Sequence, residues 1–95
     1  MYVHIVSFDV KEGNETTFLE MQKFEEKQDA KPVGLDHYHI FKDRSESNKY
    51  WLLEYWDSKA SKDKLEETEM HKKFHELRDP LFKQKYESFE CDVLV

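Results

Sequence analysis

His71 and His75 are the residues whose type and spacing most directly suggest chemistry. If the surrounding residues form a helix, a separation of four places both imidazoles on one face, beside the apolar residues Met70, Phe74 and Leu77. Such a pair at the edge of a pocket can exchange protons near neutral pH. The alternative is two half-exposed histidines on an amphipathic helix. A metal site would need a third ligand from elsewhere, so the pair alone does not predict one.

Glu54 is the second candidate, because it is the charged residue within the otherwise uncharged segment 50–56. Side chains alternate along a strand, so Glu54 and Trp56 share a face. A carboxylate in such a segment must either pair with a Lys, Arg or His from a helix or have a raised pKa. A raised pKa would suit a general base that takes the phenolic proton of a substrate. Trp56 precedes the helix-cap pair Asp57-Ser58, where it can line a pocket or belong to the core.

The elements that would position these residues follow from hydrophobic periodicity and turn residues. They are a strand over residues 1–10, a helix over 15–28, strands over 35–42 and 50–56, a weak helix over 58–67 and a strand over 88–95. Between the last two elements lies a helix that Thr68 caps and that Asp79-Pro80 either kinks or restarts. This order is the split βαβ arrangement, so the sequence predicts an α+β, ferredoxin-like βαββαβ fold. A chain of 95 residues predicts one domain spanning 1–95.

The strands over 1–10 and 50–56 have apolar residues on both faces, as central strands covered on two sides do. Helices can cover only one face of such a sheet, so we expect a second copy to cover the other and the protein to be a homodimer. His37 and His39 share a strand face with Leu35, and we expect this histidine pair to be solvated or to face the dimer partner.

The helix over 15–28 is expected to bury Phe18, Met21 and Phe24 in the core, because they recur at near-helical spacing. The acidic pairs Glu25-Glu26 and Glu66-Glu67 are expected to lie on solvated helix faces.

Composition argues against several classes of function. The chain has 15 Lys and Arg against 21 Asp and Glu, a net charge of −6, which disfavours nucleic acid or an anionic membrane as a partner. We expect no membrane-spanning segment and no leader.

The single Cys91 argues against a disulfide framework or a cysteine-based zinc site, so we expect a cytoplasmic setting. Gly13 and Gly34 do not form a phosphate-binding loop for a nicotinamide or a flavin. The 14 aromatic residues (Phe 7, Tyr 5, Trp 2) suggest bulky packing, a flat ligand or both.

Four short motifs occur in an order and spacing typical of one family. They are Phe8-Asp9-Val10-Lys11-Glu12-Gly13, then Pro32-Val33-Gly34-Leu35, then Leu53-Glu54-Tyr55-Trp56-Asp57-Ser58, and then His71, Phe74, Leu77, Pro80 and Leu81. Together they resemble the antibiotic biosynthesis monooxygenase family of dimeric α+β barrel proteins over nearly the whole chain. The resemblance implies the ferredoxin-like fold and a homodimer. It also implies an O2-dependent monooxygenase that acts on a quinol, phenolic or polyketide-like aromatic molecule with no metal and no flavin.

The resemblance also includes a haem-degrading branch of the same fold. Trp56 matches the pocket tryptophan of that branch and His75 matches its haem-ligating histidine, whereas Ser7 stands where the branch has an asparagine. We therefore expect no cofactor, with haem as the alternative. The expected catalytic residues are His71, Glu54 and His75, and the expected substrate-binding residues are Trp56, Ser7 and Phe74. A third reading is a dimeric ligand-binding or stress-response module without catalysis.

Overall fold

The computed structural model describes residues 1–27 and 32–95 and contains the elements that the sequence predicts, in the predicted order. Residue 28, the predicted end of the first helix, lies outside the described residues. The elements are β1 (Tyr2–Asp9), α1 (Glu15–Lys27), β2 (Leu35–Lys42), β3 (Lys49–Trp56), α2 (Lys59–Glu66), α3 (Glu69–Arg78), the 3-10 helix η1 (Asp79–Leu81) and β4 (Glu87–Asp92). The ferredoxin-like prediction is confirmed, and η1 is the restart predicted at Asp79-Pro80.

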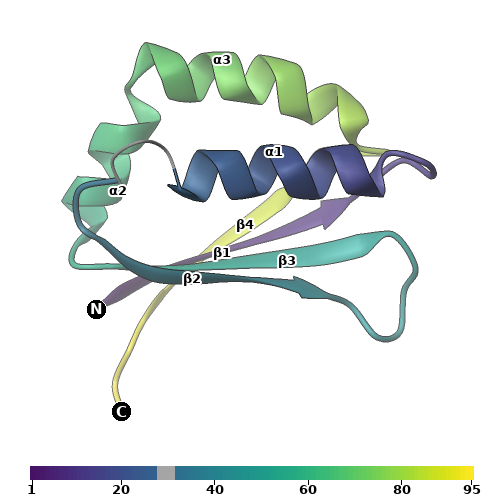
Figure 1. Cartoon of the computed structure of the whole chain (residues 1–95). Coiled ribbons are helices and arrows are strands. Elements are labelled where there is room, and N and C mark those ends of the chain that lie inside the picture. Colours follow the sequence, from purple (N-terminus) through teal and green to yellow (C-terminus); the bar gives the residue numbers. More distant parts are fainter. Residues whose placement is uncertain (28–31) are drawn as a thin grey trace.

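The strands form one antiparallel sheet in the order β2-β3-β1-β4, so β1 and β3 are central as predicted. Figure 1 shows α1 and α3 on the same side of this sheet. The helix-facing side of β3 carries the buried residues Tyr50, Leu52, Glu54 and Trp56, which alternate with half-buried residues. None of the helices in the described ranges is long and apolar enough to cross a membrane.

The core between sheet and helices is largely aromatic. Phe8 lies at its centre, with its ring centroid 5.1 Å from that of Phe18 on α1 and 5.1 Å from that of Phe82 after η1. A second cluster joins Tyr2, Leu35 and Trp56 at the other end of the sheet. Tilted aromatic pairs at such distances add to the stability that apolar burial provides.

The predicted core assignment of α1 is wrong for Phe24, whose residue surface is 68% exposed, and correct for Phe18. Helical periodicity explains the difference, because the buried residues of α1 are Phe18, Gln22, Glu25 and Glu26. Met70 and Leu77 of α3 are exposed in the same way. The inward faces of both helices are therefore more polar than the sequence pattern suggests, because Phe18 and Phe74 point inward while Phe24, Met70 and Leu77 lie outside.

The prediction that Glu25-Glu26 is solvated is also wrong, because both residues are buried. A third correction concerns Leu35, which was expected to share a face with His37 and His39. A register irregularity between Leu35 and His37 turns Leu35 to the helix side, where it packs with Tyr2 and Trp56.

Gly34 brings the loop before β2 close to the start of α2. Its φ of +91° favours glycine, and a Cβ there would lie 2.5 Å from Ser61 and 2.7 Å from Asp57. The carbonyl of Gly34 accepts a hydrogen bond from the amide of Asp57 at 2.8 Å. Ser58 then caps α2 by accepting from the amide of Ser61 at 3.2 Å. These contacts fix where α2 begins.

Two phenylalanines on α1 give a matched test of this packing. Phe18→Ala should lower the free energy of unfolding by about 3–5 kcal/mol, because a fully buried ring is lost and a cavity remains. Phe24→Ala should change it by less than about 0.5 kcal/mol, because that side chain is largely exposed. Urea unfolding of both variants measures the difference, and equal losses would contradict the assignment of the inward face.

Candidate functional site

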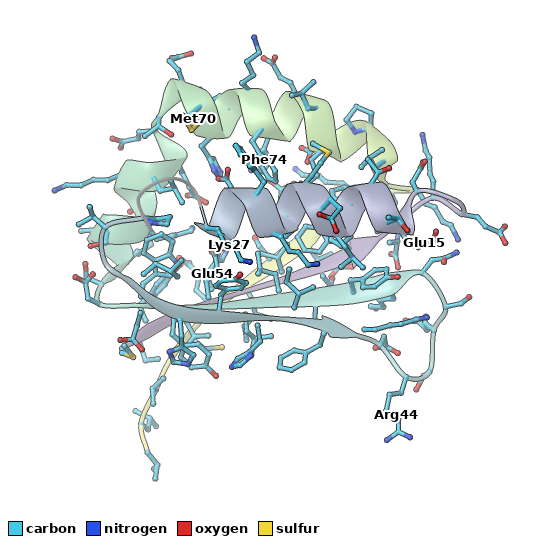
Figure 2. The ribbon with its side chains drawn as sticks, viewed as in Figure 1. Glu15, Lys27, Arg44, Glu54, Met70 and Phe74 are labelled. Carbon is cyan, nitrogen blue, oxygen red and sulfur yellow. The ribbon has the colours of Figure 1, made fainter. Side chains whose placement is uncertain are left out.

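A cavity of about 250 Å³ lies between the helix-facing side of the central strands and helices α1 and α3. Strand pairing places His4 opposite Glu54 and Val6 opposite Leu52 on the sheet side. Figure 2 shows Phe74 projecting from α3 toward α1, and Glu54 on the sheet below α1. The apolar part of the lining is Val6, Leu52, Trp56, Leu65 and Phe74, and the polar part includes His4, Glu25, Glu26, Glu54, His71, His75 and Arg78.

Local structure sets the position of the two histidines. Thr68 caps α3 because its Oγ1 accepts a hydrogen bond from the amide of His71 at 3.1 Å. His71 is therefore in the first turn of α3, and His75 follows one turn later on the same face. The helical spacing predicted from the sequence is thus realised, and both imidazoles line the cavity.

The first polar group of the site surrounds Glu54. Its Oε1 accepts a hydrogen bond from Trp56 Nε1 at 3.3 Å and lies 3.5 Å from His4 Nδ1. The carboxyl of Glu26 also hydrogen-bonds to Glu54, and Gln22 Nε2 donates to Glu26 Oε1 at 3.1 Å. Glu54 is therefore paired, which is one of the two alternatives predicted from the sequence. Its histidine partner, His4, comes from a neighbouring strand and not from a helix.

The two buried carboxyls differ in charge. Burial raises the pKa of Glu26, and the neighbouring charge of Glu54 raises it further, so Glu26 is the protonated member. Burial also acts to raise the pKa of Glu54, but hydrogen bonds from His4 and Glu26 outweigh burial and leave that pKa lowered. The pair thus holds one proton and one negative charge, with Glu26 donating to Glu54.

The second polar group is a continuous series of contacts through the histidines. His71 Nδ1 lies 2.7 Å from Glu25 Oε1, and His71 Nε2 lies 2.9 Å from His75 Nε2. His75 Nδ1 lies 3.1 Å from Asp79 Oδ2 and 3.2 Å from Arg78 Nη2. Two Nε2 atoms at hydrogen-bond distance must hold one proton between them, because one nitrogen donates and the other accepts.

The charge state of His75 follows from its surroundings. Burial lowers its pKa and the Arg78 guanidinium lowers it further, while the Asp79 carboxylate opposes these effects in part. His75 is therefore neutral near pH 7, where it can accept a proton.

Arg78 connects this group to the aromatic core. Its guanidinium carbon lies 5.0 to 5.3 Å from the centroids of Phe8, Phe74, Phe82 and Tyr86. Its Nη1 donates to Gln22 Oε1 at 3.1 Å, and its Nε and Nη2 donate to Asp79 Oδ1 at 3.1 and 3.0 Å. A buried guanidinium held in this way fixes the side chains that it contacts.

The structure brings together five of the six residues predicted for the site. His71, His75, Glu54, Trp56 and Phe74 line the same cavity. Ser7 is not with them, because alternation along β1 places it on the other face of the sheet from His4 and Val6.

Sequence reasoning missed the partners that connect the predicted residues, namely His4, Gln22, Glu25, Glu26, Arg78 and Asp79. One signal was present on α1, since Gln22, Glu25 and Glu26 follow Phe18 at intervals of four, seven and eight. These intervals place all three on the face of Phe18.

The residues present do not fit haem as a ligand of His75. Nε2 of His75 is engaged by His71, and Nδ1 by Arg78 and Asp79. The cavity of about 250 Å³ is also smaller than the roughly 300–1,000 Å³ of pockets for drug-sized ligands.

A one-sheet ferredoxin-like fold with a cavity between sheet and helices defines the structural class. Residues 1–77 match the family described as antibiotic biosynthesis monooxygenase. The chain belongs to this family. No curated protein matches the sequence significantly.

Solved structures agree with the fold. A Nitrosomonas europaea protein that bears the same family name superposes with a TM-score of 0.87 at 18% identity, covering 100% of both chains. A protein of that name from Caulobacter crescentus gives 0.86 at 16% identity, covering 99% of this chain and 90% of the other. A Mycobacterium tuberculosis protein gives 0.85 at 11% identity, covering 99% and 97%. At these identities the likeness shows the fold alone.

The Glu26–Glu54 pair predicts how stability depends on pH. The pKa of Glu26 is raised on folding, so its contribution to stability is complete below the ordinary value of about 4.3 and is lost as pH rises. Glutamine keeps the hydrogen bonds but has no proton to lose. Relative to wild type, Glu26→Gln should therefore gain about 1 kcal/mol of stability for each pH unit between about 5 and 7.

Urea unfolding across this pH range measures the gain. Glu20→Gln is the control, because Glu20 lies exposed on the same helix and should keep the pH dependence of wild type. A Glu26→Gln variant whose stability follows that of wild type at every pH would show that Glu26 is ionised in the folded protein.

Proposed function

We propose that the protein is a small monooxygenase that needs no cofactor and oxidises a phenolic or quinol-type aromatic molecule with O2. The observation that supports this most directly is the histidine pair, held by Glu25 at 2.7 Å, on the wall of a cavity that Trp56 and Phe74 also line. Membership of the antibiotic biosynthesis monooxygenase family agrees with it. Engineered cavities of about 150 Å³ hold benzene, so about 250 Å³ suits one or two fused rings.

The chemistry needs a proton acceptor and a dry pocket. A phenolic hydroxyl has an ordinary pKa near 10, and its anion gives electrons to O2 far more readily than the neutral ring does. A dihydroxynaphthalene itself supplies the two electrons that an external reductant would otherwise provide. With one O2 it gives a hydroxynaphthoquinone and one water, so no external reductant is required. The protein binds the ring, removes the hydroxyl proton and keeps bulk water away.

The site residues take different parts in this reaction. The histidine pair is the base, because His75 is neutral near pH 7 and Glu25 stabilises positive charge on His71. Glu54 is assigned to orienting the substrate, since its lowered pKa makes it a weak base. Trp56 and Phe74 supply contact area for the ring. Ser7, on the other face of β1, has no part in this proposal.

Oxygen uptake with a dihydroxynaphthalene tests the proposal. His71→Ala should reduce the rate on the order of a hundredfold, because a positioned base contributes two to four orders of magnitude. Trp56→Ala should mainly weaken substrate binding. The wild-type rate should fall only as pH drops below about 6.5, because the pKa of His75 is lowered from that ordinary value.

Lys72→Ala is the control for His71→Ala, because Lys72 lies exposed on the same helix. Wild-type uptake no faster than the uncatalysed reaction, with His71→Ala and Trp56→Ala indistinguishable from it, would favour the binding-module reading.

The assembly we propose is a homodimer in which two sheets pack face to face. Proteins of this fold usually form dimeric barrels. The sheet face away from the helices carries Trp51, Leu53 and Tyr55, and His37 stacks on Tyr55 with ring centroids 4.1 Å apart. Helices leave this face uncovered (Figure 1), so a second copy would bury it.

Light scattering tests this assembly. Wild type should give about twice the chain mass of 11.6 kDa. Leu53→Glu should give a monomer, because a charge would be buried in the interface. Phe24→Glu places the same charge on the exposed helical surface and should stay dimeric. A monomeric wild type, or dissociation by Phe24→Glu and not by Leu53→Glu, would contradict sheet-to-sheet packing.

A further inference from the structure

Asp79 lies at the outer end of the contact series that begins at Glu25 in the cavity. Side-chain exposure rises along the series from 4% for Glu25 and 15% for His71 to 26% for His75 and 39% for Asp79. The series therefore leads from the cavity wall to the protein surface. A pocket that excludes bulk water needs such a route for any proton that it exchanges with solvent.

We propose that His71 and His75 act together as one proton acceptor, that the accepted proton lies between their Nε2 atoms, and that protons enter and leave the pair through His75 Nδ1 and Asp79. The inference rests on the proposed function, because it assigns a route to the proton that the substrate loses.

In the accepting state each histidine donates its Nδ1 proton to a carboxylate. His71 donates to Glu25 at 2.7 Å and His75 donates to Asp79 at 3.1 Å. Both Nε2 atoms then have lone pairs on the cavity wall. The 2.9 Å between them in the structure fits the state in which a proton has arrived. The O–H bond breaks, its electron pair stays on the oxygen, and the proton forms an N–H bond at one Nε2 that donates to the other.

The pair then carries one positive charge, with a carboxylate at each end. His75 Nδ1 gives its proton to Asp79 Oδ2, from which water takes it, and the shared proton moves to His75 Nε2. Arg78 Nη2, at 3.2 Å, donates to the lone pair left on His75 Nδ1. One proton is thus taken from the substrate and one is released to water. The reverse sequence returns a proton when the reduced oxygen atom leaves as water.

Arg78 is a positioning residue for this route. Its two hydrogen bonds to Asp79 Oδ1 leave Oδ2 to face His75. Gln22 and four aromatic rings hold the guanidinium in turn. The outer end of the route is therefore oriented by the packed core.

The first test needs no substrate. In protein labelled with ¹⁵N-histidine, a proton shared by two Nε2 atoms shows coupling to both nitrogens, and its exchange with water can be timed. Asparagine keeps an acceptor for Arg78 but does not take up a proton. Asp79→Asn should therefore slow this exchange by at least about tenfold. Glu76→Gln, an exposed change on α3, should exchange as wild type does. Equal exchange in Asp79→Asn and wild type, or a proton coupled to one nitrogen only, would overturn the route.

The second test uses turnover. In dilute buffer Asp79→Asn should lower kcat by about tenfold with KM unchanged, because proton release becomes limiting. Small imidazole buffers should restore kcat as their concentration rises, which a purely structural defect would not allow. A loss of kcat that no buffer restores would overturn the route. Absence of wild-type uptake, with the exchange result as expected, would contradict the proposed monooxygenase alone.

Discussion

The interaction on which this structure most depends is the burial of the Glu54 carboxylate on a central strand. An ionised carboxylate away from water is costly unless neighbouring donors satisfy it. His4, Trp56 and protonated Glu26 meet that need from β1, β3 and α1. In the described part of the chain no buried side-chain nitrogen or oxygen lacks a hydrogen-bond partner. The polar inner face of α1 is a consequence of this requirement, because Glu26 and Gln22 must point toward the sheet.

Hydrophobic patterning was sufficient to predict the elements and their order. The 35–42 strand was predicted with the observed bounds, and Thr68 caps α3 as expected. Alternation along β3 also sorted its residues correctly into two faces, because the strand is regular. It did not show which face the helices cover, since both faces are apolar. The prediction for the sheet face of Leu35 was wrong because the irregularity before His37 breaks the two-residue period. Nothing in the local sequence indicates this irregularity.

The site was predictable to the extent that single elements determine it. The spacing of His71 and His75 within one helix placed both imidazoles in the cavity, and the strand period placed Glu54 with Trp56. The partners could not be predicted in this way, because Glu25 meets His71 and Glu26 meets Glu54 only after α1, α3 and the sheet have packed. An acidic pair next to a lysine resembles a solvated helix surface until its tertiary neighbours are known.

Arg78 has a consequence for how the sequence can vary. Its guanidinium lies among Phe8, Phe74, Phe82 and Tyr86 while its nitrogens contact His75 and Asp79. A substitution among these rings therefore shifts a fixed positive charge as well as changing packing volume. Under the proposed proton route, we therefore expect variation in this part of the interior to be constrained by proton chemistry in addition to stability. Two variants of equal melting temperature would then differ in the basicity of His75.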